Sequence, residues 1–503
     1  MSRIAIIGAG FGGMTAAGEL ARAGHHVTLF EQSQTLGGKA QVVSRNGVTL
    51  DTGPTLLTLP AVVRETFARL GAEDLLPRFI PLPHQARYQW SDGSTFDCYE
   101  SLERTIDSSP ADAKGLRSFY EEAAAIHRAA GEPYLEAPFD GLPRFLARVA
   151  KRGLDTMMSG LKLSTLDGLA RKHFRTSPRL QQFVGRFATY AGASPYQASA
   201  AFALIPHLER HFGVHHVEGG MAALVAALAK ALTRAGIDIH LGVKAHWEQS
   251  RHGLIAGPRG DEQSFDSVIV NADPLADRPL GTEQLALSGY VLLVEVNRRL
   301  ALPHHFISFS DDYQREFSEL FSGSVPTDPT VYFCHPAASD PTVAPEGKSG
   351  IFAMVNAPAL SKPPAPGEWD HHAAILRERC LAVLRRVAPE TSEVTVLGER
   401  TPLDLAARGA PGGSIYGFLP HGKFGPFRRP RIRSEVPGVF YAGGGTHPGG
   451  GVPLVMLSGH FAAELCSLSL RQRGARAVSR RGEAVPRRSV PGEDGRGEGQ
   501  RVH

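Results

Sequence analysis

The chain has 503 residues, 42% of them hydrophobic and 21% charged, with a formal net charge of +4, which are ordinary values for a globular protein of two or three domains. Its four cysteines lie far apart and form no CxxC pair, which argues against a zinc ribbon, an iron–sulfur cluster or a disulfide scaffold and suits a reducing cytoplasm. The first residues leave no room for a signal peptide, and no uncharged apolar stretch reaches the roughly 18 residues of a membrane span, so we expect no bilayer crossing.

The first elements form a predicted βαβ unit. An apolar strand over Ile4–Ile7 leads into a G-x-G-x-x-G motif, then a helical pattern that stops at Gly24, then a strand that ends at Glu31. The glycines of this loop are Gly8, Gly10, Gly12 and Gly13.

Each part of the unit has a physical reason. Gly8 allows a tight turn, Gly10 lets the backbone approach a pyrophosphate, and Gly13 lets the helix pack on the strand. The helix N-terminus offers free N–H groups to phosphate, and Glu31 can accept ribose hydroxyl protons. A glycine-rich turn without a ligand is the alternative, but the strand–helix–strand context favours a dinucleotide site.

The segments after Glu31 point to FAD rather than NAD. A second glycine pair with a cation, Leu36-Gly37-Gly38-Lys39, precedes the motif Asp51-Thr52-Gly53-Pro54-Thr55. The pair resembles the extended fingerprint of FAD proteins in the glutathione-reductase-like and amine-oxidase-like superfamily. That resemblance implies that Gly38 and Lys39 lie along the pyrophosphate and ribityl chain, and that Gly53, Pro54 and Thr55 lie near the isoalloxazine. The superfamily more often has Arg at position 39. Lys keeps the positive charge but cannot donate the two parallel hydrogen bonds of a guanidinium group.

Two later segments match the same superfamily. A returning segment, Gly236 to Val243, has the shape that places a Val backbone against adenine, and Val243 matches it. The apolar strand Val439–Ala442 then feeds a glycine-rich loop and an amphipathic helix, which again aim N–H groups at the cofactor. The residues of this loop expected at the flavin end are Gly443, Gly444, Thr446, Val452 and Pro453. Gly444 stands where much of the superfamily has an acid.

The expected fold class is α/β, with a Rossmann-type FAD-binding domain and an inserted α+β substrate domain. The cofactor domain is discontinuous, over 1–75, 215–275 and 405–470, and the substrate domain takes 76–214 and 276–404. Within the latter, Tyr290–Val296 is expected to form part of a sheet that a helix over His371–Arg386 covers.

Further segments resemble the bacterial carotenoid desaturases, a phytoene-desaturase-like family, and among its branches the 1-hydroxycarotenoid 3,4-desaturases, also called methoxyneurosporene dehydrogenases. They are 86–94, 185–195, 309–313, 326–332 and the Thr446–Pro453 loop, and the resemblance covers about residues 3–470. It implies a long acyclic C40 carotenoid with a tertiary hydroxyl or methoxyl at C-1, a new C3–C4 double bond, and FAD as hydride acceptor. Oxygen or a quinone would reoxidise the flavin.

His447 is the one titratable side chain in the predicted flavin-facing loop. It is the candidate for handling or positioning a proton, and structural hydrogen bonding in the loop is the alternative. Catalysis otherwise consists of holding one C–H bond over the flavin and excluding water.

Four other functions remain open at this point. A phytoene or neurosporene desaturase would do the same chemistry at other carbons, and a carotenoid isomerase would use reduced flavin without net oxidation. An amine oxidase usually needs a covalent-flavin Cys or an aromatic cage, and the loop has neither before His460. A carotenoid-binding flavoprotein without turnover is the non-enzymatic alternative.

A carotenoid substrate implies contact with a bilayer. Leu142, Phe145, Leu146, Val149 and Ala150 follow helical spacing, and Arg144, Arg148, Lys151 and Arg152 lie on another face, with an apolar continuation at Met157, Met158 and Leu161. We therefore expect a cytoplasmic protein that binds the inner face of the cell membrane peripherally. An ordinary surface helix is the alternative.

The remaining features carry little function. The histidine pairs 215–216, 304–305 and 371–372 and His207-x-x-x-His211 do not predict a metal site, because position 208 lacks the Glu of an HExxH motif. Residues 471–503 hold nine arginines against four acids and no aromatic residue, so we expect a disordered, solubilising tail, with an anionic membrane as the alternative contact. Nucleic acid is the least expected partner.

Overall fold

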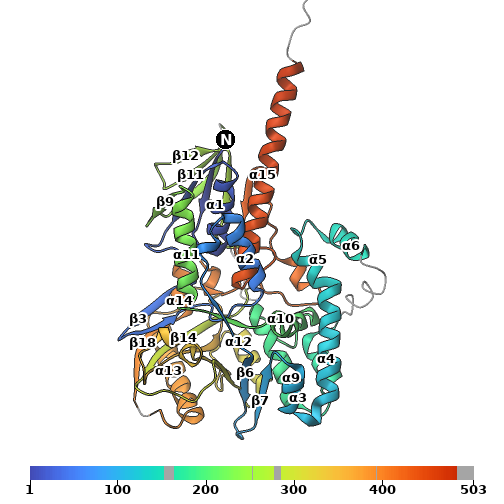
Figure 1. Ribbon diagram of the computed structural model, residues 1–503, viewed down its shortest axis with the longest axis vertical. Coiled ribbons are helices and arrows are strands. Elements are labelled where there is room, and N and C mark those ends of the chain that lie inside the picture. Colours follow the sequence, from blue (N-terminus) through green and yellow to red (C-terminus); the bar gives the residue numbers. More distant parts are fainter. Residues whose placement is uncertain (152–163, 252, 277–284, 392, 484–503) are drawn as a thin grey trace, which may run out of the picture.

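The computed structural model describes residues 1–151, 164–251, 253–276, 285–391 and 393–483. Its elements build a parallel sheet at one end of the molecule and a larger mixed sheet at the other, with a group of helices beside the latter (Figure 1). Strands of the two sheets alternate along the chain, so neither sheet comes from one continuous segment.

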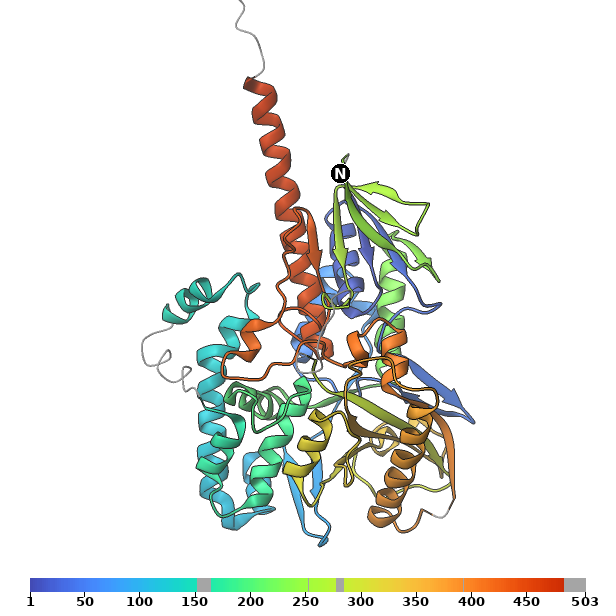
Figure 2. The same cartoon turned by 180° about the vertical axis from the view of Figure 1, so that it is seen from behind.

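The parallel sheet has five strands in the order β19-β13-β1-β2-β9. Their bounds are Val439–Tyr441, Ser267–Val270, Arg3–Ile7, His26–Glu31 and Asp238–Leu241. Ile4, Ala5 and Ile6 at its centre are fully buried, as a strand covered on both faces requires. One face packs on α1 (Phe11–Arg22), α11 (Met221–Arg234) and α15 (Val452–Glu483). A three-stranded sheet of β10 (His246–Ser250), β11 (Gly253–Gly257) and β12 (Gln263–Phe265) covers the other face (Figure 2).

The mixed sheet has seven strands in the order β18-β14-β17-β16-β15-β6-β7. Their bounds are Val394–Arg400, Ser288–Val296, Ser349–Ala357, Val331–Cys334, His305–Ser308, His84–Gln89 and Thr95–Tyr99. One face packs on α13 (Glu368–Val387), which confirms the predicted strand over Tyr290–Val296 and the helix that covers it. The other face packs on β4 (Val48–Asp51), a strand joined to the parallel sheet by the cofactor loops.

The helical group fills the space between β6 and the surface and shares one apolar core. It contains α4 (Ala113–Ile126), α8 (Leu166–His173), α9 (Pro178–Gly185) and α12 (Tyr313–Phe321), and α10 (Leu204–Phe212) packs on α4. Further elements are β3 (Val42–Arg45), α2 (Pro60–Leu70), β5 (Phe79–Pro81), α3 (Leu102–Asp107), α5 (Glu132–Leu135), α6 (Leu142–Ala150), β8 (His215–Val217) and α14 (Pro402–Ala407). These assignments agree with the predicted α/β class, and the residue boundaries of the two domains stay a prediction.

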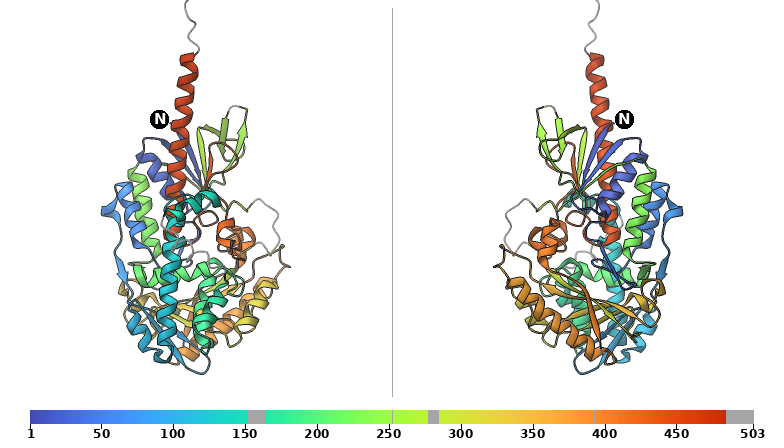
Figure 3. Two further views of the ribbon diagram at one scale, coloured as in Figure 1. Left: turned by 90° about the vertical axis from the view of Figure 1, so that its right-hand side faces the viewer. Right: turned by 90° about the vertical axis from the view of Figure 1, so that its left-hand side faces the viewer.

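The final helix, α15, corrects one expectation and bears on a second. The tail predicted to be disordered from residue 471 is helical to Glu483, because the helix is already nucleated in the core and its Arg, Ala and Glu residues propagate it. Its segment Val452–Ala475, with a hydropathy of 1.3, is also long and apolar enough to cross a membrane. Because 56% of that window is buried and packs on the parallel sheet, it is a core helix whose end projects from the body (Figure 3). Residues 484–503 lie outside the described residues.

Candidate functional site

The predicted cofactor residues gather at the carboxyl edge of the parallel sheet. Gly8 follows β1 with φ of 98°, and a Cβ there would approach the Asn271 carbonyl oxygen to 2.9 Å. A Cβ at Gly13 would overlap the Gly8 carbonyl oxygen, so this glycine is what lets α1 pack against its strand. The carboxyl ends of the neighbouring parallel strands lie at this same edge, where open α/β sheets bind their ligands.

Three glycine segments that are far apart in the sequence meet at this edge. A Cβ on Gly38 would lie 3.2 Å from Gly10 Cα, and one on Gly12 would lie 3.0 Å from the Gly443 nitrogen. Gly10 is the N-cap of α1, with no side-chain cap from the described residues. The free N–H groups at the start of α1, and the bare backbone around them, fit the pyrophosphate of a dinucleotide.

Asn271 lies at the centre of these glycines and was not singled out from the sequence as a site residue. Its Nδ2 donates to the Gly8 carbonyl oxygen at 3.2 Å. Its Oδ1 is buried without a hydrogen-bond partner among the described residues. The only sequence signal was its place at the end of β13, which pairs with β1.

Glu31 occupies the position expected for a ribose-binding acid. Its side chain is buried, Oε2 accepts from the Ala9 N–H at 2.7 Å, and Oε1 accepts from the Ser33 N–H at 2.8 Å. Each oxygen keeps a further lone pair that a ribose hydroxyl could donate to. The Val243 N–H donates to the Glu31 carbonyl oxygen at 2.9 Å, so the predicted returning segment does run beside this strand.

A second group of residues lies where the resemblance implies the flavin end. Lys39 Nζ donates to the Ile415 carbonyl oxygen at 2.6 Å, and a Cβ on Gly53 would overlap the Lys39 carbonyl oxygen. Burial lowers the pKa of Lys39, an effect that the nearby Asp273 carboxylate opposes. Pro54 is half-buried and connects Gly53 to Thr55.

Arg429 and Asp273 complete this group, and neither was predicted. Arg429 is 8% exposed, and its Nη1 donates to the Tyr416 carbonyl oxygen at 3.0 Å and to the Gly444 carbonyl oxygen at 2.7 Å. A cation therefore contacts the backbone of Gly444, the position that lacks the usual acid. Arg429 lies in an irregular loop, where no periodicity or motif marks a residue as functional.

The loop before α15 is fixed by internal hydrogen bonds. The Gly443 N–H donates to Ser458 Oγ at 2.8 Å, and Thr446 Oγ1 donates to the Pro430 carbonyl oxygen at 2.7 Å. Val452 and Pro453 are buried at the start of the helix. Thr446 thus holds the loop in place through Pro430, and the cofactor contacts expected of Thr446, Val452 and Pro453 stay a prediction.

His447 lies in an aromatic cluster. Its ring is 1% exposed, with centroids 4.4 Å from Tyr134 and 5.9 Å from Phe461. Burial lowers the pKa of His447 to about 3, so the imidazole is neutral at pH 7. Neither ring nitrogen has a hydrogen bond of regular geometry among the described residues, although the Ala137 backbone lies close to the ring. This setting favours positioning over proton transfer, and the proton-handling role stays a hypothesis.

A buried polar network joins the cofactor loop to the mixed sheet. Thr55 Oγ1 and Tyr332 Oη are 2.7 Å apart, and Tyr332 Oη is 2.8 Å from His305 Nδ1. Tyr332 lies in one cross-strand row with Ile307 and Tyr88, so these side chains share the face that looks toward the cofactor loops.

Arg186 stands over the Tyr88 end of that row. Its Nη1 donates to Tyr88 Oη at 2.8 Å and its Nη2 to Tyr190 Oη at 2.9 Å, while Tyr190 Oη donates to Glu209 Oε1 at 2.6 Å. A guanidinium and a carboxylate are thus enclosed in the helical core and linked through a phenol. In the sequence, Arg186 belongs to a segment that resembles the desaturase family, and no role was predicted for it.

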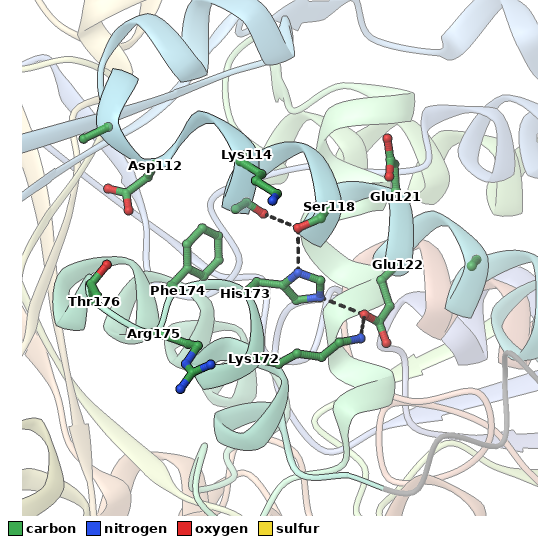
Figure 4. Close-up of a pocket in the computed structure, with 13 residues that line it drawn as sticks. Asp112, Lys114, Ser118, Glu121, Glu122, Lys172, His173, Phe174, Arg175 and Thr176 are labelled. Atoms are coloured by element: carbon green, nitrogen blue, oxygen red, sulfur yellow. Dashed lines mark hydrogen bonds and ion pairs between the residues drawn. The ribbon is translucent and has the colours of Figure 1, made fainter.

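The hollow in Figure 4 lies away from these residues, between α4 and α8. It has a volume of about 620 Å³, and inside it Ser118 Oγ, the His173 ring and Glu122 form a hydrogen-bonded chain with distances of 2.8 and 2.7 Å. Ser118 lies in mid-helix and also donates to the Gly115 carbonyl oxygen at 3.2 Å. Backbone N–H groups there are used within the helix, so no oxyanion site accompanies the serine, and the chain ties α4 to α8.

Comparison with known proteins places this geometry in context. Residues 11–467 match the family described as flavin containing amine oxidoreductase. A hydroxyneurosporene desaturase of Cereibacter sphaeroides is 33% identical over 94% of this chain and 99% of its own, and one of Rhodobacter capsulatus is 34% identical over 92% and 96%. The cyclohexylamine oxidase of Brevibacterium oxydans, at 16% identity, shares the fold with a TM-score of 0.61 over 93% of this chain and 99% of its own.

Proposed function

The chain belongs to the family of flavin containing amine oxidoreductases, and we propose that it is a carotenoid desaturase that introduces a C3–C4 double bond into a 1-hydroxy or 1-methoxy acyclic carotenoid. The proposal is carried by the similarity to hydroxyneurosporene desaturases over nearly the full length of both chains. A similarity that long includes the substrate part of the fold as well as the cofactor part.

FAD is the flavin that the site suits. The glycines around Gly10 and the acid Glu31 form an adenosine and pyrophosphate site, and Lys39 and Arg429 provide cations further along the same edge. Such an arrangement would hold both phosphates of a dinucleotide and leave the Thr55 side for the ring system. When bound, FAD supplies the acceptor for the hydride and proton that the substrate loses.

The side chains of the chain itself orient the substrate and exclude water. The tertiary oxygen at C-1 is three bonds from C-3, so a group that binds it must lie close to the reacting carbons. Arg186, with Tyr88 and Tyr190 bound to its two Nη atoms, presents donors next to the face that carries Tyr332 and Thr55. We assign recognition of the C-1 oxygen to Arg186 and this phenol network.

Membrane contact is part of the proposal. Phe145 and Val149 of α6 pack inward on Phe139 and Phe427, whereas Leu142 at the start of the helix is 41% exposed and Arg144 is exposed on another face. The outer side of α6 is therefore suited to an anionic bilayer surface on the cytoplasmic side, where the lipid-soluble substrate is dissolved. Residues 152–163, which hold the rest of the predicted basic and apolar face, lie outside the described residues. Oxygen or a quinone would take the electrons from the reduced flavin.

The decisive experiment compares two substrates. The purified protein with FAD is added to liposomes that contain either a 1-hydroxylated acyclic carotenoid or phytoene, and the absorption spectrum is followed. A red shift with the hydroxylated carotenoid alone supports 3,4-desaturation, because each added conjugated double bond moves absorption to longer wavelength. A shift with phytoene moves the assignment to an earlier desaturation. In a parallel sample with chemically reduced FAD, a change of isomer without oxidation of the carotenoid identifies an isomerase. Binding without any change, with either form of FAD, identifies a carotenoid-binding flavoprotein.

A further inference from the structure

Two imidazoles and a thiol meet on the face of the mixed sheet that looks toward the cofactor loops. They belong to His304, His305 and Cys334, and one ligand atom from each lies within 4.8 Å of the others. His305 and Cys334 are direct cross-strand partners of β15 and β16, so their side chains leave the sheet on the same side. All three residues are at most 3% exposed.

The imidazole nitrogens of this cluster lack hydrogen bonds. Both ring nitrogens of His304 and Nε2 of His305 are buried without a partner among the described residues. Tyr332 holds Nδ1 of His305 at 2.8 Å, which fixes the ring and leaves Nε2 free. A buried nitrogen without a partner destabilises a fold, so three of them together call for a bound species.

The neighbouring His335 shows that burial alone does not leave an imidazole nitrogen without a hydrogen bond. Its Nδ1 lies 3.0 Å from the Leu302 carbonyl oxygen and its Nε2 lies 3.1 Å from Ser349 Oγ. His335 is as deeply buried as His304 and is fully paired. Of the buried histidines 304, 305 and 335 at this edge of the mixed sheet, only the two that face Cys334 have unpaired ring nitrogens.

The donor set identifies the kind of species. Neutral imidazole nitrogen and thiolate sulfur are the ligands that Zn²⁺ prefers, in a tetrahedron with ligand atoms roughly 3.3–3.8 Å apart. The three donor atoms lie within 4.8 Å of one another, so the His304 ring and the Cys334 thiol would move toward the fixed His305 ring when the ion binds.

The residues around the cluster, His216 and Asp340, also suit a divalent ion. The ring of His216 lies 4.9 Å from that of His304, and its Nε2 lies 3.1 Å from the buried carboxylate of Asp340. A carboxylate behind a histidine is the usual support for a metal-binding imidazole. A thiolate at Cys334 together with this carboxylate balances two positive charges.

We propose that His304, His305 and Cys334 bind a zinc ion, with His216 as the nearest further ligand. The ion would link β15 and β16 to β8 and, through Tyr332, to Thr55 of the cofactor loop. The inference does not depend on the proposed function, because it rests on the donor set alone. The sequence could not indicate it, since Cys334 is isolated from any second cysteine and acquires its partners only through strand pairing.

The test measures metal in the full-length, FAD-loaded protein. Purified protein is equilibrated with Zn²⁺, dialysed, and analysed for metal by mass spectrometry. A parallel sample receives Co²⁺, for which a thiolate ligand gives a charge-transfer band in the near ultraviolet. We expect one zinc per chain and a cobalt band that is lost in Cys334→Ser. An Asp340→Asn variant is expected to bind zinc about 10- to 100-fold more weakly, as for other supporting carboxylates.

Matched controls separate a site from general loss of structure. Cys380→Ser removes another buried cysteine, from α13, and is expected to keep both the zinc and the cobalt band. Bound FAD and the thermal unfolding curve report folding of each variant. Wild-type protein with no zinc and no thiolate–cobalt band would overturn the proposal even if Cys334→Ser failed to fold, and so would equal metal content in Cys334→Ser and wild type.

Discussion

Gly13 is the residue of the cofactor loop at which a side chain is least tolerable. A methyl group there would overlap the Gly8 carbonyl oxygen, which lies in the backbone and cannot move without displacing the loop. We predict that Gly13→Ala purifies with less than about a tenth of the wild-type FAD, because overpacking of this kind costs about 1–3 kcal/mol or more. The ratio of flavin to protein absorbance measures it.

Gly474→Ala provides the control for that prediction. A Cβ at Gly474 would contact nothing within 4 Å, and the residue lies in α15 without a positive φ. This variant should keep its FAD and be unchanged or slightly more stable, since Ala favours a helix over Gly. Normal FAD content in Gly13→Ala would remove the argument that this close approach builds the site.

Arg186 is the residue at which substrate recognition can be separated from chemistry. Arg186→Lys keeps a charge but loses the fork that binds Tyr88 and Tyr190 together. A hydrogen bond to a charged group contributes about 1.5–3 kcal/mol, so we predict a fall of roughly 10- to 100-fold in kcat/KM for the 1-hydroxylated carotenoid. The corresponding fall for a carotenoid without the C-1 oxygen should be several-fold smaller.

Arg377→Lys is the matched control for Arg186. Arg377 also forms a forked pair, with Glu399, but on the α13 side of the mixed sheet. The Arg377→Lys variant should keep kcat/KM for both carotenoids near the wild-type value. Equal losses of kcat/KM for both substrates in Arg186→Lys would mean that the network supports the fold and does not recognise the C-1 oxygen of the carotenoid.

At the scale of single elements, α12 carries a buried acid whose titration affects stability. Glu316 is 1% exposed, and its carboxyl accepts from Thr330 N–H at 3.0 Å and from Thr330 Oγ1 at 2.6 Å. Burial raises the pKa of Glu316 to about 8, although the bonds from Thr330 oppose the shift. The folded chain therefore holds this proton at pH values where the unfolded chain, with a pKa of about 4.3, has released it.

The sign of the pH effect follows. The contribution of Glu316 is fully present below about pH 4.3 and is lost as the pH rises toward about 8, by at most about 1.4 kcal/mol per pH unit. Glu316→Gln should remove this slope from denaturant unfolding curves recorded between pH 5 and 8. Glu319→Gln, in the same helix, removes a carboxyl whose pKa is lowered by the Thr327 backbone N–H, so it should not change the slope in this range. If Glu316→Gln showed the same dependence of unfolding free energy on pH as the wild type, the dependence could not be assigned to the Glu316 carboxyl.

The elements also show where sequence reasoning succeeds and where it stops. The β1–α1–β2 unit, β14 and α13 were predictable because their apolar residues recur with the period of a buried strand or an amphipathic helix. The helical end of α15 was not predictable, because Arg-rich composition resembles a disordered tail and only the helix beneath it supplies the nucleus. Among the site residues, Glu31 and the glycines have a fixed spacing. Arg429 and Asp273 meet only through loop packing, which leaves no spacing to detect.

At the scale of the whole molecule, the function depends on a contact between two sheets that no local pattern describes. Thr55 follows β4, which pairs with β3 in a separate two-stranded sheet, and Tyr332 belongs to the mixed sheet, yet their hydroxyl groups are 2.7 Å apart. The sequence indicated each residue separately, Thr55 through its motif and Tyr332 as part of a family-like segment. Their distance depends on how β3 and β4 set one sheet against the other, so it required the structure.

Two basic features of the molecule could face an anionic membrane, α6 and the end of α15, and the proposed function favours α6. Arg144 in α6 and Lys151 directly after it are exposed, whereas Phe145 and Val149 are used in internal packing. Each cation near a membrane surface contributes about 1 kcal/mol, so we predict that Arg144→Gln with Lys151→Gln weakens binding to phosphatidylserine vesicles roughly 30-fold at low salt. Vesicle sedimentation measures the bound fraction.

Two further variants decide between α6 and the other basic feature. Arg117→Gln with Arg234→Gln removes two exposed arginines, each paired with a carboxylate elsewhere on the surface, and should leave vesicle binding unchanged. A chain truncated after Ala475 loses most of the tail arginines and should also still bind if α6 is the contact. Loss of binding on truncation, with none in the α6 variant, would transfer the membrane contact to the tail and orient the molecule with α15 pointing at the bilayer. That outcome would overturn the assignment of the bilayer contact to α6.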